Sequence, residues 1–203
     1  MNYTVDNVGM NMMSKNHSRS EEKAYKNQNK LKTALILELE MVTNNFIEAF
    51  DNLKVSTVKG DESIIWYSLS MLIYNREHIL ELLDQIKYLI EDEQYNTEIM
   101  NLKLLLESYS ESDINKNGLR KNFGRYVKEW FENTDKEPIL EHNVFEKSSI
   151  PNLDVSQMIR HFDPETFELT FLEETYDLKK FEDLVIDINK SIDEIYRENY
   201  IAF

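Results

Sequence analysis

Cysteine is absent from the 203 residues, and glycine and proline are scarce, with four and three copies. The lack of cysteine excludes a disulfide scaffold, a zinc ribbon, an iron–sulfur protein and a cysteine nucleophile. So few glycines and prolines argue against a β-rich fold with many tight turns, and neither GxGxxG nor GxxxxGK[ST] occurs. The longest apolar stretches, such as 69–73, are far shorter than the ~20 residues of a transmembrane helix.

Apolar residues make up 41% of the chain, which is enough for a core, and the length suits one domain of ordinary size. The net charge of −15 is uneven, because residues 1–30 carry +2 and residues 31–203 carry −17. An acidic body repels phosphate backbones at long range, so broad DNA binding is not expected, whereas a local basic patch is still able to contact RNA. The polar N-terminus has no signal-peptide core, so we expect a cytoplasmic protein without membrane association.

Apolar residues recur every three or four positions in several segments, which is the period of one helix face. Residues 1–27 lack this period and predict a flexible tail, followed by a single domain over 28–203. Gly60 is expected to end the first helix, and Asp61 and Asp177 are expected to cap the second and the last. The predicted helices span 31–54, 61–92, 97–110, 119–131 and 178–199.

The stretch between the fourth and the last helix has a different pattern. Residues 132–153 predict irregular structure, since Pro138 and Pro151 act as breakers. Alternating polar and apolar residues over 167–171, with the short segment 158–162 before Asp163-Pro164, predict a small β-hairpin. The expected fold is all-α: an up-down helical bundle of four to five helices with a small β-hairpin or irregular insert before the last helix.

Residues that could carry chemistry are few. None of the four histidines has a Glu-x-x-His motif, and the spacing of His78 and Glu81 gives two ligands at most, so no metal or cofactor is expected. Three cations fall within six residues at the start of the fourth helix, and an Arg-His pair precedes the predicted turn. These two stretches supply the candidate residues for binding phosphate, RNA or a partner: Arg120, Lys121, Asn122, Arg125, Tyr126, Arg160 and His161.

A family resemblance rests on three features of residues 62–199. A long helical hairpin is followed by a helix that opens Leu-Arg-Lys-Asn-Phe-Gly at 119–124, then by Phe-Asp-Pro-Glu-Thr-Phe-Glu-Leu-Thr-Phe at 162–171 and a last acidic helix. This order resembles HEPN-type proteins, which are four-helix bundles of bacterial and phage toxin, abortive-infection and defence systems. The resemblance implies a homodimer through the third and fourth helices. Active members are RNases whose motif is an Arg, four to six further residues and then a His. The Arg and the His of two subunits meet at the dimer interface.

The decisive histidine is missing here. The fifth to seventh residues after Arg120 are Arg125, Tyr126 and Val127, and a tyrosine, with a pKa of about 10, is a poor substitute for an imidazole near neutral pH. The resemblance therefore implies a degenerate member, and we expect a non-catalytic binding or regulatory protein of a defence or counter-defence system, with a protein partner. Two alternatives stay open. The first is an RNase with a non-standard site, for which His161, next to Arg160, would supply the missing imidazole if the pair faces the start of the fourth helix. The second is an acidic inhibitor that mimics nucleic acid.

Overall fold

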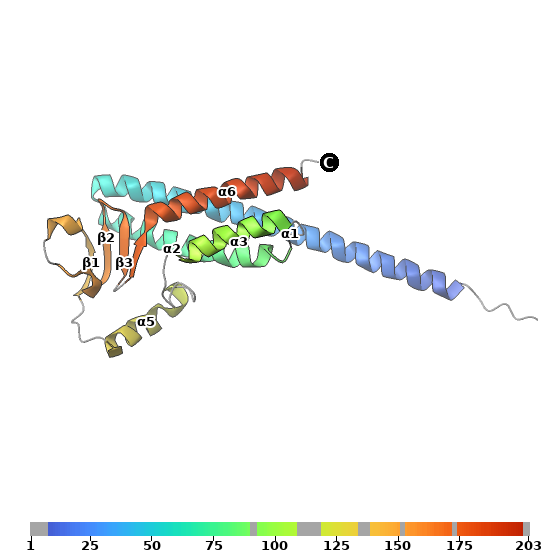
Figure 1. The fold of residues 1–203 in the computed structure, drawn as a ribbon, viewed down its shortest axis with the longest axis horizontal. Helices are drawn as coiled ribbons and strands as arrows, with labels where there is room; N and C mark the ends of the chain where they lie inside the picture. Colours follow the sequence, from blue (N-terminus) through green and yellow to red (C-terminus); the bar gives the residue numbers. More distant parts are fainter. Residues whose placement is uncertain are drawn as a thin grey trace, which may run out of the picture.

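A computed structural model describes residues 8–89, 93–108, 119–133, 139–150, 153–171 and 174–200. Within these ranges the structure does not describe the side chains of 8–22, 93–96, 107–108, 119–123 and 195–200, or some single ones such as that of Tyr126. The helices are α1 (Val8–Lys59), α2 (Glu62–Ile86), α3 (Glu93–Ser108), α5 (Leu119–Asn133) and α6 (Leu178–Tyr200). The strands are β1 (Ile139–Val144), β2 (Met158–Asp163), β3 (Glu168–Phe171) and β4 (Glu174–Asp177). The described chain is thus mostly helical, with a small sheet before the last helix, as predicted (Figure 1).

The turn between α1 and α2 forms where the sequence predicts it. Gly60 has a φ of +69°, which a residue without Cβ adopts at little cost, and its N–H donates to the Thr57 carbonyl at 3.2 Å. The N–H of Asp61 donates to the Ser56 carbonyl at 3.1 Å, which completes a Schellman C-cap. The Asp61 carboxylate then accepts from the N–H of Ile64 at 3.2 Å. Two consecutive residues therefore end one helix and cap the next.

The helix boundaries differ from the predicted ones away from this turn. α1 begins at Val8, because residues 8–30 contain no proline and a single glycine, so nothing in them interrupts a helix even without an apolar face. α2 ends at Ile86 instead of 92, with the N–H of Lys87 bonded to the Leu83 carbonyl and a turn through residue 89. α3 starts at Glu93 instead of 97. The division into a tail over 1–27 and a domain over 28–203 stays a prediction.

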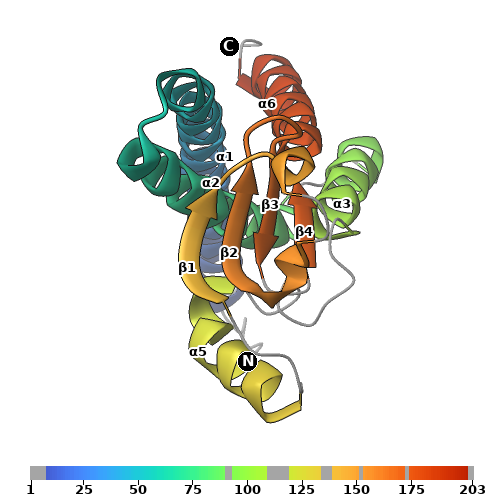
Figure 2. The same cartoon turned by 90° about the vertical axis from the view of Figure 1, so that its left-hand side faces the viewer.

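The sheet has the strand order β1-β2-β3-β4, with β1 parallel to β2 and the other neighbours antiparallel (Figure 2). The predicted hairpin is confirmed as β2 and β3, with Phe162 paired to Leu169. The prediction of irregular structure over 132–153 is wrong for β1, whose polar residues at 141–143 conceal its strand pattern. β4 was not predicted, because its four residues are too few to show an alternation.

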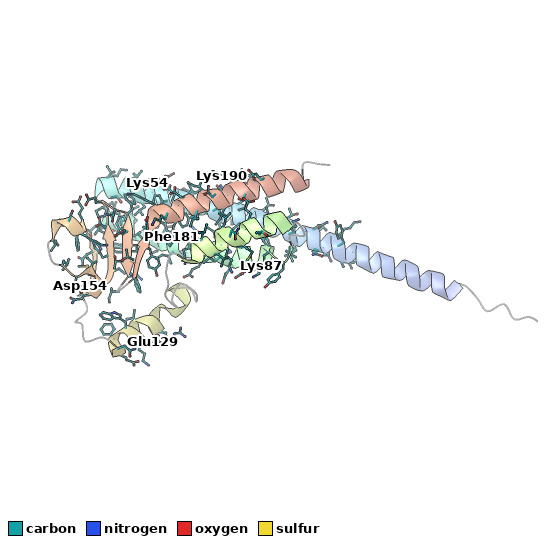
Figure 3. The ribbon with its side chains drawn as sticks, viewed as in Figure 1. Lys54, Lys87, Glu129, Asp154, Phe181 and Lys190 are labelled. Atoms are coloured by element: carbon teal, nitrogen blue, oxygen red, sulfur yellow. The ribbon has the colours of Figure 1, made fainter. Side chains whose placement is uncertain are left out.

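The core lies between α1, α2, α3, α6 and one face of the sheet. Its largest fully buried side chains include Phe46, Phe50, Phe162 and Phe171. Phe181 belongs to the same core and lies near the start of α6, at the end of that helix nearest the sheet (Figure 3). No helix among the described residues combines the length and the apolarity needed to cross a bilayer.

Polar contacts fix the helices relative to one another. The guanidinium of Arg76 on α2 donates to the Leu106 carbonyl of α3 at 2.9 Å and lies 5.2 Å from the ring centroid of Phe181. Leu106 is in the last turn of α3, where carbonyls lack intrahelical partners and favour a cation. A second tie joins Lys103 of α3 to Asp84 of α2, with 2.6 Å between the ammonium and the carboxylate. One buried arginine thus connects α2, α3 and α6.

Candidate functional site

A pocket of about 480 Å³ lies between α2 and the β2–β3 hairpin. Its size falls in the range of ~300–1,000 Å³ that is usual for binding pockets. Most of its lining is aromatic or aliphatic, with one arginine and one serine as the remaining residues. The lining residues are Trp66, Tyr67, Leu69, Ser70, Met71, Ile73, Tyr74, Arg160, Leu169 and Phe171.

Strand alternation explains why Arg160 reaches this pocket. Side chains two residues apart on a strand share a face, so Arg160 and Phe162 face the same way. The register pairs Phe162 with Leu169, which places Arg160 opposite Phe171 on that face. The guanidinium carbon of Arg160 accordingly lies 5.9 Å from the ring centroid of Phe171, within the range of a cation–π contact.

The Arg160 guanidinium is a partly buried charge. Desolvation by burial lowers the pKa of Arg160, yet a guanidinium stays protonated at any pH at which proteins fold. A desolvated cation beside an open pocket is stabilised by any anion that reaches it, because the attraction between charges grows as water is excluded. Arg160 therefore gives the pocket lining its one positively charged side chain.

The opposite wall belongs to the first half of α2. Tyr67, Ser70 and Tyr74 follow spacings of three and four, so they lie on one helix face, with Trp66 beside them. Tyr67 is 66% exposed and Tyr74 is 40% exposed, so the pocket has an open aromatic rim. The Ser70 hydroxyl donates its proton to the Trp66 carbonyl at 2.8 Å, which leaves its lone pairs as acceptors.

His161 lies on the other face of β2. Its ring is fully buried, 4.4 Å from the ring centroid of Phe145, and its Nε2 lies 2.9 Å from the Phe145 carbonyl oxygen. Because a carbonyl only accepts, Nε2 carries the proton. Desolvation by burial lowers the pKa of His161, so the ring is neutral near pH 7. This geometry holds the β1–β2 connection against the sheet.

Asp163 organises the turn that follows β2. Its carboxylate accepts from three backbone N–H groups: Lys147 at 3.1 Å, Glu165 at 2.9 Å and Thr166 at 3.3 Å. Burial alone would raise the pKa of Asp163, but these donors outweigh it and hold the pKa below its ordinary value. The side chain is 1% exposed. Asp163 therefore ties the hairpin turn to the β1–β2 connection.

The predicted site residues do not all come together. Arg160 lines the pocket, whereas its neighbour His161 faces the opposite side of β2. Arg125 is exposed on α5, with 3.5 Å between its Nε and the Glu129 carboxylate. The remaining predicted residues belong to α5, and their side chains lie outside the described part of the chain: Arg120, Lys121, Asn122 and Tyr126.

The aromatic wall of the pocket was not predicted. The sequence does hold a signal for it, since Tyr67 and Tyr74 are seven residues apart on α2 and fall outside its buried apolar stripe. Large aromatic residues on the polar face of a helix mark surfaces that contact another molecule. Their pairing with Arg160, about 90 residues further along the chain, follows only from the fold.

Comparisons with known proteins add no relative: no family model matches the chain, and no curated protein or solved structure matches it. Among the described residues, no group of three or more histidine, aspartate or glutamate side chains is placed to hold a metal ion. The properties of the pocket itself therefore carry the functional argument.

Proposed function

We propose that this protein is a non-catalytic recognition protein that binds a partner protein through the pocket between α2 and the β2–β3 hairpin. The setting is bacterial or phage defence or counter-defence, and the scaffold is a HEPN-like helical bundle. Both rest on the family resemblance of residues 62–199. The observation that carries the binding role is the pocket lining, which joins Arg160 to an exposed aromatic rim.

The lining composition favours recognition over turnover. Among the ten lining residues the only hydroxyl groups are those of Ser70, Tyr67 and Tyr74, and none of the ten is a histidine, aspartate, glutamate or lysine. A hydroxyl nucleophile needs a base within hydrogen-bond reach, and this lining offers none. Trp, Tyr and Arg are also the residues that contribute most to binding energy at protein interfaces.

A protein partner fits the pocket better than a metabolite does. Small ligands are usually enclosed over most of their surface, whereas Tyr67 and Tyr74 leave this rim open to solvent. The matching partner segment presents an aromatic or aliphatic side chain, which enters between α2 and the hairpin, with a carboxylate next to it that meets Arg160. Overall the partner is neutral or basic, because the body of this protein is strongly acidic.

A matched pair of small probes tests this chemistry. We expect N-acetyl-L-phenylalanine to bind with a Kd on the order of 1 mM and its neutral amide about tenfold more weakly, because only the acid pairs with Arg160. Arg160→Gln should reduce the affinity for the acid to that for the amide. Titration followed by NMR measures both, and the changing resonances should come from residues of α2, β2 and β3.

Arg125→Gln is the control, because it removes the same charge from an exposed position of α5 that is paired with Glu129. It should leave the affinity for both probes unchanged. Equal affinities for the acid and the amide, or the same loss in both variants, would contradict a role for Arg160.

The two other functions suggested by the sequence stay predictions. An RNase with a non-standard site would depend on Arg120 and its neighbours in α5, whose side chains lie outside the described residues. An acidic nucleic-acid mimic would depend on the charge of the body, which is −17 over residues 31–203. The homodimer through α3 and α5 rests on the resemblance alone. No contact of the described residues favours any of the three.

A further inference from the structure

The N-terminal part of α1 is a helical arm that extends beyond the core. The first core residue of α1 is Ile36, and every side chain from 23 to 31 is exposed. Tyr25 and Leu31 are the large apolar residues of this stretch, and they are 59% and 51% exposed. Figure 1 shows the arm leaving the other helices on the side away from the sheet. We call residues 8–35 the α1 arm.

The arm and the body carry opposite charges. Residues 8–35 hold six lysines and arginines against two carboxylates, Glu21 and Glu22, which gives +4, whereas residues 36–203 carry −18. Lys23, Lys26 and Lys30 follow spacings of three and four, so they share one face of the helix. In the sequence the same spacing continues back to Arg19 and Lys15. These five positions span about 80° of the helix circumference and about 20 Å of its length.

The arm also holds this charge away from the acidic body. At 1.5 Å per residue, Lys26 lies about 15 Å beyond Ile36 and Lys15 about 30 Å beyond it. Exposed charges are screened over about 8 Å at physiological ionic strength. The repulsion that the body exerts on a polyanion is therefore weak along most of the arm, although it dominates at the body itself.

We propose that the α1 arm binds the phosphate backbone of a nucleic acid, with the stripe of Lys23, Lys26 and Lys30 as its described contact surface. This role is independent of the pocket. When a row of lysines neutralises the phosphates of a nucleic acid, the condensed counterions are released, and this release favours binding. Scattered carboxylates on a protein surface hold no such condensed counterions, so an acidic protein would bind the lysines less well. Individual ion pairs between exposed protein side chains contribute little.

A second copy of the chain is the competing occupant, and the arm suits it poorly. Two arms would pair as a coiled coil only through apolar residues every three to four positions. Between residues 23 and 31 the arm offers only Tyr25 and Leu31 as large apolar side chains, six positions apart. Binding is also expected to be independent of base sequence, because lysines that contact phosphates carry no base readout.

The test measures binding of the full chain to a fluorescent 20-nucleotide RNA by anisotropy. A separate titration uses a fluorescent 20-bp DNA. At low salt we expect binding at least as tight as ~0.1 mM, with a slope of log K against log salt near −3.5 for the single strand if all five cations make contact. The triple variant Lys23→Gln, Lys26→Gln and Lys30→Gln should weaken binding about tenfold or more and reduce the slope by about 2. Comparison of the two probes shows which form of nucleic acid the arm prefers.

The matched control removes three other exposed lysines, Lys128, Lys180 and Lys190, each of which pairs with a carboxylate on its own helix or at that helix's cap. It changes the net charge equally and should leave binding unchanged. Equal weakening in both triple variants, or no binding of either probe below ~0.1 mM at low salt, would overturn the proposal. Salt-sensitive self-association that the arm variant abolishes, without nucleic-acid binding, would assign the arm to a second copy instead.

Discussion

Replacement of Asp163 by alanine is expected to lower the free energy of unfolding by about 3 kcal/mol. The carboxylate is almost fully buried and accepts from the backbone N–H groups of Lys147, Glu165 and Thr166. Alanine leaves these three partly buried donors without their acceptor, and hydrogen bonds to a charged group contribute about 1.5–3 kcal/mol. Urea denaturation of the two proteins at pH 7 measures the difference.

The pH dependence gives a second test of the same contact. Because the pKa of Asp163 is lower in the folded state than in the unfolded chain, where it is about 4, the unfolded state binds the additional proton. The stabilisation is therefore fully present above about pH 5 and is lost as the pH falls through the folded pKa. We expect the difference between the wild type and Asp163→Asn to be constant from pH 7 to 5 and to shrink below pH 4.

Asp187→Asn is the control, because Asp187 is exposed on α6 and pairs with Lys190 in the same helix at 3.0 Å. Such pairs contribute only about 0.5 kcal/mol, so this variant should be almost as stable as the wild type. A loss of less than about 1 kcal/mol in Asp163→Ala would contradict the role assigned to the three backbone bonds.

Replacement of Phe50 by alanine is expected to cost about 4 kcal/mol, which makes it the most destabilising change considered. Phe50 is fully buried on α1, and its ring centroid lies 5.8 Å from that of Phe167. Phe167 in turn has a φ of +61°, packs 5.6 Å from Phe162, and accepts at its carbonyl from the N–H of Leu178, the first residue of α6. Loss of the Phe50 ring therefore opens a cavity where α1, the hairpin turn and α6 meet.

The stability of this junction is measured by thermal or denaturant unfolding with Val58→Ala as the control. Val58 is on the same helix but 89% exposed, so its truncation should change the free energy of unfolding by no more than about 0.5 kcal/mol. Phe50→Leu keeps most of the volume and should lose less than Phe50→Ala. Equal stability of the Phe50 and Val58 alanine variants would contradict the position of Phe50 in the core.

The parts of the fold that the sequence predicts are those where one local rule suffices. The apolar period identifies the buried faces of α2 and α6. Gly60 marks the end of α1, and Asp61 and Asp177 mark the starts of α2 and α6. Asp177, for example, accepts from the N–H of Lys180 at 3.2 Å at the start of α6. The hairpin was predictable for the same reason, since alternation and a turn signal are adjacent in the chain.

The missed features depend on information that is not local. Every side chain of the α1 arm from 23 to 31 is exposed, so an apolar period cannot reveal this part, and only the absence of helix breakers predicts a helix there. β1 forms because β2 supplies a parallel partner about twenty residues later, not because of its own pattern. The pocket likewise joins α2 to a hairpin about 90 residues away. Arg160 was found from its sequence neighbourhood, but its aromatic partners were not.

Site-specific photo-crosslinking tests the central claim, recognition at the pocket, most directly. With p-benzoylphenylalanine in place of Tyr67 at the pocket rim, irradiation of cells that make the protein should give one protein adduct of defined mass. Arg160→Gln in the same chain should abolish it. The control places p-benzoylphenylalanine at Tyr88 instead, which is also strongly exposed but follows the end of α2, and it should give no such adduct. The account is contradicted if Tyr67 yields no adduct, or if the adduct persists in the Arg160→Gln variant.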